Sequence, residues 1–538
     1  MRDTASLTGI SSSSGVRLRE THLRSGLASD RFTYLVLCLV LLLGIVLALP
    51  LWLVHLPPMS DFPGHAASLF IQTHVRSSPV LAGYYDFKWT PIPDLASELV
   101  VPLFPGLSAE AGTRLFLAIG VLLWVCGPAA VQYVLFRRVT LTAVVAAYFA
   151  YNPNFTMGLV NFYFAAGFGF FVISAWLASV KRPALERFLV LATLFAVIYF
   201  MHLLAMLFAG FFLIAFELAK PGNTRLKRIR SAVIIVVAAL PEVLLFLLYP
   251  AGHFGDGKFD IGLIDGLPQR VGSLGWAGFA PELVVIAAAT IWAIWSGVAR
   301  VHEKMKAPLT AVLILCLVLP ISLFGGWGLH LRFAAMGAAL LFASMDLHLS
   351  RRAKLGLLAA SVCIGIADAA TLVWFWSTPA RQAAELRTAL LKLTPGAKLV
   401  IAMDKPSIPR NGEFRHVAEY AVIDREIFDP MVLAEEGQHI IQVRPEWRRL
   451  AAATSDQSDN VPLDDLASLA RDVKGRADLL KYFPYLVRWN CNFDNLLLLR
   501  LTGEHDRVPP ELAPIAEGAV FTLYRIQAPS DCTRADPH

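Results

Sequence analysis

Long apolar runs, separated by short polar or basic stretches, fill the first 377 positions of the chain. Most of them are about 17–25 residues long, which is the length that a helix needs to cross a bilayer. Their number predicts about eleven membrane spans, and the pattern indicates an α-helical polytopic membrane protein. We expect the spans at residues 32–54, 113–136, 139–151, 159–180, 185–201, 203–219, 231–249, 283–299, 308–325, 332–348 and 355–377.

The composition agrees with this class. Of the 538 residues, 56% are hydrophobic and only 16% are charged, whereas soluble domains carry about 25% charged residues. The formal net charge of +6 does not predict nucleic-acid binding, because Lys and Arg lie mainly in short loops between spans, where they act as an orientation signal. We therefore expect membrane lipid around the chain and no nucleic-acid partner.

The basic stretches also set the expected orientation. Residues 1–31 are rich in Ser and Arg, which predicts a disordered tail that stays in the cytoplasm. The later basic clusters fall on the same side if the run 95–105 lies along the outer surface as an amphipathic segment and does not cross. The N-terminus is then inside and the C-terminus outside, and the clusters kept inside are Arg137–Arg138, Lys181–Arg182, Arg225–Arg230, Arg300–Lys306 and Arg351–Lys354.

From residue 378 to residue 538 the pattern changes. The apolar runs shorten to strand length and alternate with helix-like stretches, which predicts an extracytoplasmic α/β domain. The domain contains Cys491 and Cys532, and the other four cysteines lie in predicted spans. Cys491 and Cys532 could form a disulfide in an oxidising compartment or remain two free thiols, and the sequence does not decide between these alternatives. We expect strands at 399–403, 420–423, 439–443, 496–501 and 519–526, and helices at 380–393 and 463–482.

The segment Pro57 to His65 directly follows the first span and opens a long outer loop, residues 55–112. Its prolines and glycine favour a turn, which places Asp61 and His65 at the mouth of the membrane. A carboxylate at the bilayer edge is costly to desolvate, so we interpret Asp61 as functional, with an ordinary solvated loop residue as the alternative. The other outer loops add carboxylates, histidines and a few cations, whereas Glu242 and Asp368 in the spans are most simply interhelical hydrogen-bonding groups.

Several common enzyme motifs are absent from the sequence. It contains no phosphate-binding loop of the Gly-x-x-x-x-Gly-Lys type, no Gly-x-Gly-x-x-Gly after a strand, no His-Glu-x-x-His and no Cys-x-x-Cys. A Gly-x-Ser-x-Gly nucleophile elbow is also missing. Nucleotide-driven chemistry in the cytosol is therefore not predicted. A substrate presented at the outer membrane face, such as a lipid-linked one, suits the layout better.

This layout resembles the integral-membrane glycosyltransferases of the C superfold, which use polyprenyl-phosphate sugar donors. The resemblance covers residues 32–377 as architecture, and Asp61 after the first span matches the first acidic position. Asp86, 25 positions further on, resembles the second carboxylate, with Asp94 and Glu98 as competing matches. The motif Asp-Phe-Pro-Gly-His, with Tyr420–Arg425 and Phe428–Pro430, also resembles a bacterial set of polytopic membrane proteins with the same layout.

The resemblance implies a transferase that moves a sugar from a polyprenyl-phosphate donor to a glycan or lipid acceptor of the cell envelope, in a bacterial inner membrane. Such chemistry needs a base for the acceptor proton and positive charge for the leaving phosphate. Asp61 is the candidate base or ligand of a divalent metal. The other candidates are His65 and Asp86 for catalysis, and Arg332, His330, Lys258 and Arg270 for the phosphate.

Other interpretations stay open at this point. His202 is flanked by apolar residues and is more simply a structural histidine, and Arg332 also fits a helix-end residue that extends to the interface. Two further classes fit the chain. One is a transporter or flippase of a lipid-linked molecule, which predicts internal repeats. The other is a non-catalytic assembly protein of the cell envelope, which predicts that Asp61 and Arg332 are dispensable.

Overall fold

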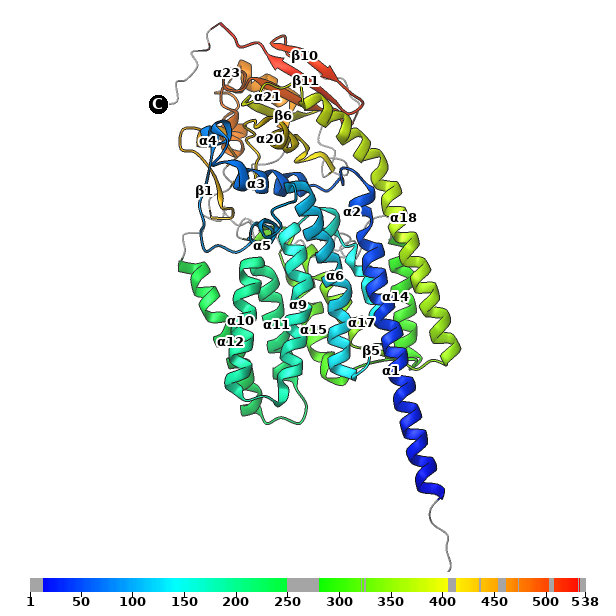
Figure 1. The fold of residues 1–538 in the computed structure, drawn as a ribbon. Coiled ribbons are helices and arrows are strands. Elements are labelled where there is room, and N and C mark those ends of the chain that lie inside the picture. Colours follow the sequence, from blue (N-terminus) through cyan, green and yellow to red (C-terminus); the bar gives the residue numbers. More distant parts are fainter. Residues whose placement is uncertain are drawn as a thin grey trace, which may run out of the picture.

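A bundle of long helices carries a cap of mixed structure on one of its ends (Figure 1). The structure is a computed structural model, and the residues that it describes are 13–248, 280–320, 322–323, 326–404, 413–434, 437–452, 461–472, 474–502, 508–530 and 532.

Six of the described helices are long and apolar enough to cross a membrane. This supports the polytopic membrane class. The six segments are Arg31–Leu53, Ala109–Phe136, Val160–Lys181, Ala184–Met201, Arg225–Leu248 and Arg351–Leu390. They correspond to α1 (Ser13–Ala48) with α2 (Pro50–Leu53), α6 (Ala109–Phe136), α9 (Val160–Ala178) with η3 (Ser179–Lys181), α10 (Ala184–Met201), α12 (Arg225–Leu248) and α18 (Arg351–Leu390).

The other five predicted spans are helices of 17 residues or fewer, so the predicted number of about eleven is not established. The run 95–105 forms a five-residue helix and a three-residue turn, which is too short to cross about 30 Å of hydrocarbon. The shorter elements are α7 (Leu141–Ala146), η2 (Ala147–Ala150), α8 (Pro153–Thr156), α11 (Leu203–Ala219), α14 (Ala280–Trp295), α15 (Glu303–Val318), α16 (Leu329–Arg332) and α17 (Ala334–Ala343).

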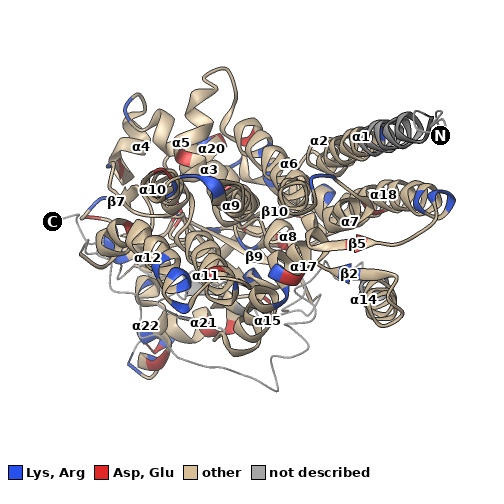
Figure 2. Ribbon diagram, turned by 90° about the horizontal axis from the view of Figure 1, so that it is seen from below, with Lys and Arg blue, Asp and Glu red and all other residues tan. Residues whose placement is uncertain are grey.

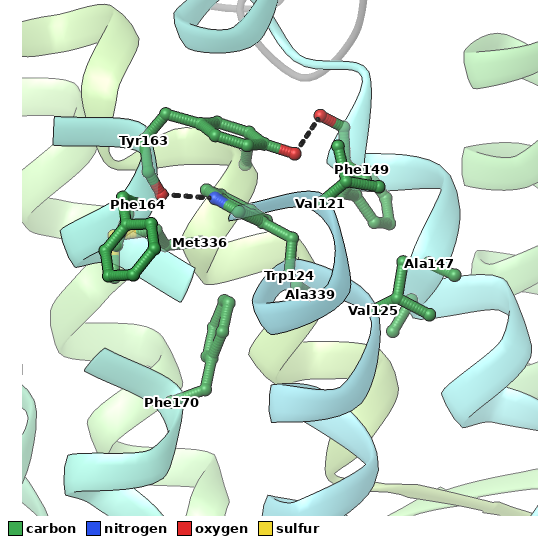
Figure 3. Close-up of a cluster of buried hydrophobic side chains, with 14 of the residues drawn as sticks. Val121, Trp124, Val125, Ala147, Phe149, Tyr163, Phe164, Phe170, Met336 and Ala339 are labelled. Carbon is green, nitrogen blue, oxygen red and sulfur yellow. Dashed lines mark hydrogen bonds between the residues drawn. The ribbon is translucent and has the colours of Figure 1, made fainter. Parts of the chain in front are cut away.

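Aromatic packing joins the central helices of the bundle (Figure 3). The indole N–H of Trp124 in α6 donates to the carbonyl of Tyr163 in α9 at 2.8 Å, and the Tyr163 hydroxyl donates to the carbonyl of Ala150 in η2 at 3.0 Å. Phe170 meets Trp124 edge-on, with ring centroids 5.4 Å apart. A buried indole or phenol needs a hydrogen-bond partner, and both find one here. These contacts fix the turn between η2 and α9, which lies directly beneath the cap.

The cap contains both the first outer loop and the C-terminal segment. Leu56, Ile71 and Tyr85 from the loop share one hydrophobic core with Leu399 and Leu497 from the C-terminal segment. The loop contributes α3 (Phe62–His74), α4 (Pro79–Tyr84), β1 (Tyr85–Phe87), α5 (Ala96–Val100) and η1 (Val101–Leu103). The C-terminal segment contributes β6 (Leu399–Met403), η5 (Val417–Glu419), α20 (Tyr420–Arg425), β7 (Ile441–Val443), η6 (Arg448–Leu450), β8 (Val461–Pro462), α21 (Leu463–Arg471), α22 (Ala477–Tyr482), η8 (Pro484–Leu486), α23 (Trp489–Asn492), β9 (Asn495–Leu499), β10 (Leu512–Glu517) and β11 (Phe521–Ile526).

A five-stranded sheet in the order β10-β11-β9-β6-β8 forms the centre of the C-terminal segment. Strands β9 and β8 run parallel to β6, and β11 and β10 continue the sheet antiparallel. The predictions for 399–403, 496–501 and 519–526 match β6, β9 and β11 within a few residues. The segment 420–423 is helical, contrary to its predicted strand. The segment 439–443 pairs with β1 of the outer loop and lies outside this sheet.

The boundary predicted at residue 378 falls inside a continuous helix. Helix α18 runs for 40 residues, and Ala383, Leu386 and Leu390 in its last turns are buried in the core of the cap. The part of α18 that precedes these residues has the apolar composition of a span. The sequence pattern changes at the point where the helix passes from the bundle into the cap, although the helix itself continues.

The basic loops lie at the end of the bundle opposite the cap (Figures 1 and 2). Here β2 (Ala299–Val301) pairs with β5 (Met345–Leu347), and Arg138 forms an ion pair with Asp346. The remaining short pair, β3 (Ser322–Leu323) with β4 (Gly326–Trp327), precedes α16. These loops and the described part of the C-terminal segment thus lie at opposite ends of the bundle.

A disulfide joins Cys491 to Cys532 in the cap, with the two Cα atoms 5.5 Å apart. It resolves the alternative left open by the sequence in favour of pairing. The other four cysteines, Cys38, Cys126, Cys316 and Cys363, lie in helices of the bundle.

Candidate functional site

Asp61 lies where the first outer loop meets the top of the bundle. Its backbone N–H donates to the carbonyl of Met157 at 3.0 Å, just before Gly158. Gly158 has a φ of +75°, and a Cβ there would lie 3.0 Å from the Phe62 nitrogen. The turn therefore needs glycine both for its left-handed backbone and for the close approach of the Asp61 segment. The bundle thus fixes the position of the Asp61 backbone.

The carboxylate of Asp61, by contrast, is not committed to the fold. Asp61 is the residue before α3, but its side chain makes no capping hydrogen bond. The side chain is 21% exposed, and its Oδ1 lies 4.0 Å from Nε2 of His416. Among the described residues, no hydrogen bond to this carboxylate is formed. It is therefore available to accept a proton or a hydroxyl group from a bound molecule.

His416 is oriented by a buried carboxylate behind it. Its Nδ1 contacts Oε1 of Glu419, one turn along, and both side chains are almost fully buried. Burial alone would lower the pKa of His416, but the Glu419 carboxylate outweighs it and raises the pKa. With Nδ1 bonded to Glu419, Nε2 faces Asp61. The three residues therefore form a row from the interior of the cap to the Asp61 carboxylate.

Next to this row, His65 of α3 is buried and faces several charged groups. Burial lowers its pKa, whereas the carboxylates of Glu98 and Asp61 raise it. Its Nδ1 is buried and has no hydrogen-bond partner among the residues that the structure describes. His65 is thus close enough to Asp61 for the carboxylate to affect its pKa, and His416 is a second histidine near the same carboxylate.

A second group of polar residues joins the cap to the bundle around Asp94. Asp94 has a φ of 74°, which is uncommon for a residue other than glycine. The side-chain amide of Asn161 in α9 donates to its carbonyl at 2.8 Å, and the Leu95 N–H donates to the carbonyl of Phe200 at 2.8 Å. Burial raises the pKa of Asp94 to about 6. Strained backbone positions persist where the surroundings determine them, often at functional sites.

Arg332 and His202 lie beside Asp94. The guanidinium of Arg332 is 3.3 Å from Nε2 of His202 and stacks over the Phe162 ring, 5.0 Å from its centroid. Oδ1 of Asp94 is 4.0 Å from the same Nε2. Burial lowers the pKa of Arg332, and the carboxylates of Asp94 and Asp61 raise it. Arg332 is thus within electrostatic range of both carboxylates, which makes it the link between the two polar groups.

The tautomer of His202 follows from its backbone contact. Its Nδ1 accepts the N–H of Leu204 at 3.1 Å, at the start of α11, so the proton of the neutral ring is on Nε2. Burial and the nearby Arg332 place the pKa of His202 well below its ordinary value, and the ring is neutral. Nε2–H and the guanidinium are both donors, and they converge. An oxygen atom that accepts from both, such as one of a phosphate, would suit this geometry.

An apolar cavity opens next to Asp94. Its volume is about 390 Å³. Its lining is almost entirely apolar and comes from the first outer loop and the end of α10: Trp89, Thr90, Pro91, Leu95, Leu99 and Phe200. Because Leu95 directly follows Asp94, an apolar chain in this cavity would end close to the Asp94 and Arg332 side chains.

Only some of the site residues predicted from the sequence lie close together in the structure. Asp61, His65 and Arg332 lie together, but Asp86 does not join them. Asp86 is exposed in β1 and accepts the N–H of Phe87 at 2.8 Å. His330 lies in α16 two residues before Arg332. Lys258 and Arg270 are outside the described residues.

Asp94, His202, His416 and Glu419 are the additions that the structure makes. Asp94 was a competing match for the second carboxylate, and its position favours it over Asp86. His202 was interpreted as structural, whereas its ring lies beside Arg332. His416 and Glu419 are three residues apart in the C-terminal segment, a spacing that puts two side chains on one face of a helical turn. That spacing is the only signal that the sequence offered for them.

A metal ion is not supported by the arrangement of these residues. Across the part of the chain that the structure describes, no group of three or more His, Cys, Asp or Glu side chains is placed to hold one. Asp61 and His416 alone face each other, 4.0 Å apart. The divalent metal therefore stays an expectation from the sequence, and we route no chemical step through it.

Asp429 provides a prediction about stability. It lies in the cap, fully buried, and burial together with the Glu419 carboxylate raises its pKa to about 8. A carboxyl group with a raised pKa stabilises the folded state while it is protonated, and that contribution is lost as the pH rises through about 8. We expect the melting temperature of the wild type to fall between pH 6 and pH 9 by about 2 °C more than that of Asp429→Asn. Asparagine keeps an oxygen to accept the Met431 N–H, as Asp429 does at 2.8 Å. Equal slopes in the two proteins would contradict this assignment.

Two solved structures are similar to this chain along most of its length. The crystal structure of ArnT from Cupriavidus metallidurans in the apo state is 14% identical, with a TM-score of 0.48, and the match covers 92% of this chain and 98% of that chain. The structure of the same protein bound to undecaprenyl phosphate is 12% identical, with a TM-score of 0.45 over the same shares. No residue of this chain takes a role from that similarity.

No family model matches the chain. The curated proteins also contain no match to it.

Proposed function

We propose that this protein is a membrane glycosyltransferase that moves a sugar from a polyprenyl-phosphate donor to an acceptor of the cell envelope. The observation that carries the proposal is that one turn of the bundle holds both the Asp61 segment and Arg332. The carbonyl of Met157 accepts the Asp61 N–H at 3.0 Å, and the side-chain amide of Asn154 donates to the Arg332 carbonyl at 3.5 Å. Sugar transfer from a lipid phosphate needs both a base and a cation. Both are supplied here at one place.

In the proposed reaction, Asp61 takes the proton of an acceptor hydroxyl group. The hydroxyl oxygen forms a bond to the anomeric carbon of the sugar, and the bond from that carbon to the phosphate oxygen breaks. Polyprenyl phosphate leaves with the electron pair of that bond. Arg332 and the Nε2–H of His202 hold its phosphate oxygens. Asp94 is a positioning residue that orients these two hydrogen-bond donors.

The apolar cavity beside Asp94 suits the start of a polyprenyl chain. A phosphate held at Arg332 would place the first isoprenyl units toward Leu95 and Leu99, which line the cavity. The hydrocarbon then gains by leaving water, at about 0.8 kcal/mol for each buried CH₂ group.

The proposed orientation puts the cap outside the cytoplasm. Two independent observations support it. The basic loops gather at the end of the bundle opposite the cap (Figure 1), as expected for the cytoplasmic side. The cap also contains the disulfide Cys491–Cys532, and such bonds persist in oxidising compartments such as the bacterial periplasm. The substrate would accordingly be reached from the outer leaflet of an inner membrane.

The proposal is tested by comparing cells with and without this protein. Mass spectrometry of their envelope glycans and lipids should show a sugar modification that depends on the protein. If the protein instead changes only the distribution of a lipid-linked molecule across the membrane, the transporter class is favoured. If neither product nor distribution changes, the protein is an assembly factor and the proposal is wrong.

Gly158 offers a test of how far the activity depends on the position of Asp61. Gly158→Ala places a methyl group 3.0 Å from the Phe62 nitrogen, at a φ of +75°. We expect the displaced Asp61 to lower the transfer rate by about tenfold to a hundredfold. The matched control is Gly222→Ala, which has a φ of +79° but nothing within 4 Å of the new methyl group. Both variants bear a left-handed alanine, so rate constants that fall equally would show that the Asp61 contact is irrelevant.

A further inference from the structure

A second site lies at the opposite end of the bundle, far from the cap. Helices α6, α9 and α11 end there beside the start of α15, and a cavity of about 150 Å³ opens between them. Its cationic lining residues are Arg137, Lys181, Lys220 and Lys304. Each comes from a different segment of the chain, so the cluster arises from the fold and not from one basic run.

The negative charge of the buried carboxylate in this cavity is already compensated by cations inside the protein. Glu217 is the carboxylate in its lining, and its side chain is 1% exposed. Glu217 accepts from Arg187 at 3.0 Å and from Trp176 at 3.0 Å, and Lys220 is 3.3 Å away. Two cations therefore compensate this single carboxylate, and it has little charge left to offset the rim.

The rim consists of Arg137, Lys181 and Lys304. Within the described residues, no carboxylate lies within ion-pair distance of these three. The nearby acids have partners of their own: Glu186 pairs with Arg182, and Glu303 pairs with Lys306 at 2.8 Å. Arg137 also has a φ of 56°, a backbone position that usually takes glycine at the end of a helix. The three rim cations thus surround the cavity without internal compensation.

Apart from the imidazole of His302, the rest of the lining is aliphatic or aromatic. Val134, Leu135 and Leu177 contribute to the wall, and Val180 at the rim is 51% exposed. An anion in this cavity would therefore have cations around it and aliphatic side chains beside it. A soluble anion would gain nothing from contact with the aliphatic side chains. A phospholipid carries a phosphate next to acyl chains, so it can contact both the cations and the aliphatic side chains. The cavity also lies at the end of the spans, where phospholipid headgroups are found.

We propose that this cavity binds the phosphate headgroup of an anionic phospholipid from the inner leaflet. The lipid phosphate takes the place between Arg137, Lys181 and Lys304, and the acyl chains lie along Val180 and the outside of the bundle. This inference does not depend on the proposed glycosyltransferase activity, because none of its residues lies in the cap or near Asp61.

Native mass spectrometry of the full chain in detergent tests it, with phosphatidylglycerol and phosphatidylcholine as probes. The test variant is Arg137→Gln/Lys181→Gln/Lys304→Gln. The matched control is Arg351→Gln/Arg352→Gln/Lys354→Gln, which removes the same charge from the start of α18 at the same end of the bundle. We expect the wild type and the control to keep one phosphatidylglycerol in preference to phosphatidylcholine. The test variant should bind it at least tenfold more weakly, since each cation near lipid phosphate contributes about a fivefold effect.

Two further arms make the result decisive. Arg137→Gly removes one rim cation and relieves the left-handed backbone together, so it should weaken phosphatidylglycerol binding without lowering the melting temperature. Inorganic phosphate at millimolar concentration should not displace the lipid. The proposal is overturned if both triple variants lose binding alike, if phosphatidylcholine binds as tightly as phosphatidylglycerol, or if inorganic phosphate displaces the lipid.

Discussion

Asp61→Asn is expected to lower the rate of sugar transfer by about a hundredfold to ten-thousandfold, which is the usual contribution of a general base. Asparagine keeps the volume of the side chain and removes the group that takes the acceptor proton. Folding should be preserved, because the Asp61 carboxylate makes no capping hydrogen bond and the backbone contact to Met157 does not involve it. The measurement is the turnover rate at saturating donor and acceptor, with protein level and melting temperature determined in parallel.

The same loop supplies a matched control. Asp86→Asn removes one carboxylate from the first outer loop, but Asp86 is exposed on β1 and contacts only the N–H of its neighbour among the described hydrogen bonds. We expect this variant to keep the wild-type rate within about twofold, since exposed substitutions away from special features have small effects. If Asp61→Asn and Asp86→Asn have equal turnover rates, Asp61 is not the general base of the reaction.

Arg332→Gln is expected to weaken donor engagement by about tenfold to a hundredfold, as judged by KM and by direct binding of polyprenyl phosphate. The loss corresponds to charge-assisted hydrogen bonds, each contributing about 1.5–3 kcal/mol. Arg332→Lys should fall between the wild type and Arg332→Gln, because lysine keeps the charge but not the planar fork of donors. Binding of polyprenyl phosphate that is equal in all three proteins would contradict the role of Arg332.

Loss of Arg332 also removes one of the positive charges that act on the buried Asp94 carboxylate, the other being that of His439, so a structural explanation must be separated from a functional one. The double variant Asp94→Asn/Arg332→Gln removes both charges, and asparagine tolerates the left-handed backbone at position 94. We expect the double variant to regain melting temperature but not donor binding. If donor binding returns as well, the defect of Arg332→Gln came from the stranded Asp94 carboxylate and not from a lost phosphate contact.

The membrane class and much of the bundle could be predicted because apolar runs and basic loops are local signals. Helix α6 and the Arg137–Arg138 pair after it are one example, since a span and its positive end are both visible in sequence order. The strands β6, β9 and β11 were predictable for the same reason, as short apolar runs. The segment 420–423 was not, because an apolar run of four residues fits a strand or a buried helix equally well.

The site could be predicted only in part because it is assembled from four distant regions: the first outer loop, the turn at His202, the segment at Arg332 and the C-terminal segment. Asp61 was marked by its position after the first span, and Arg332 by its place in an outer loop. His416 lies 355 residues after Asp61, and nothing local shows that the C-terminal segment and the first loop share one core. Asp86 and Asp94 are eight residues apart in the same loop, and only the pairing of β1 with β7 decides that Asp86 faces away.

The most direct test of the account is release of polyprenyl phosphate by the purified full chain. The protein in lipid nanodiscs is given lipid-linked sugars extracted from membranes of its host, together with envelope acceptors, and free polyprenyl phosphate is measured by mass spectrometry. The account predicts acceptor-dependent release by the wild type and by Asp86→Asn, and release reduced at least a hundredfold in Asp61→Asn. Absence of release by the wild type, or equal release by Asp61→Asn, would contradict it.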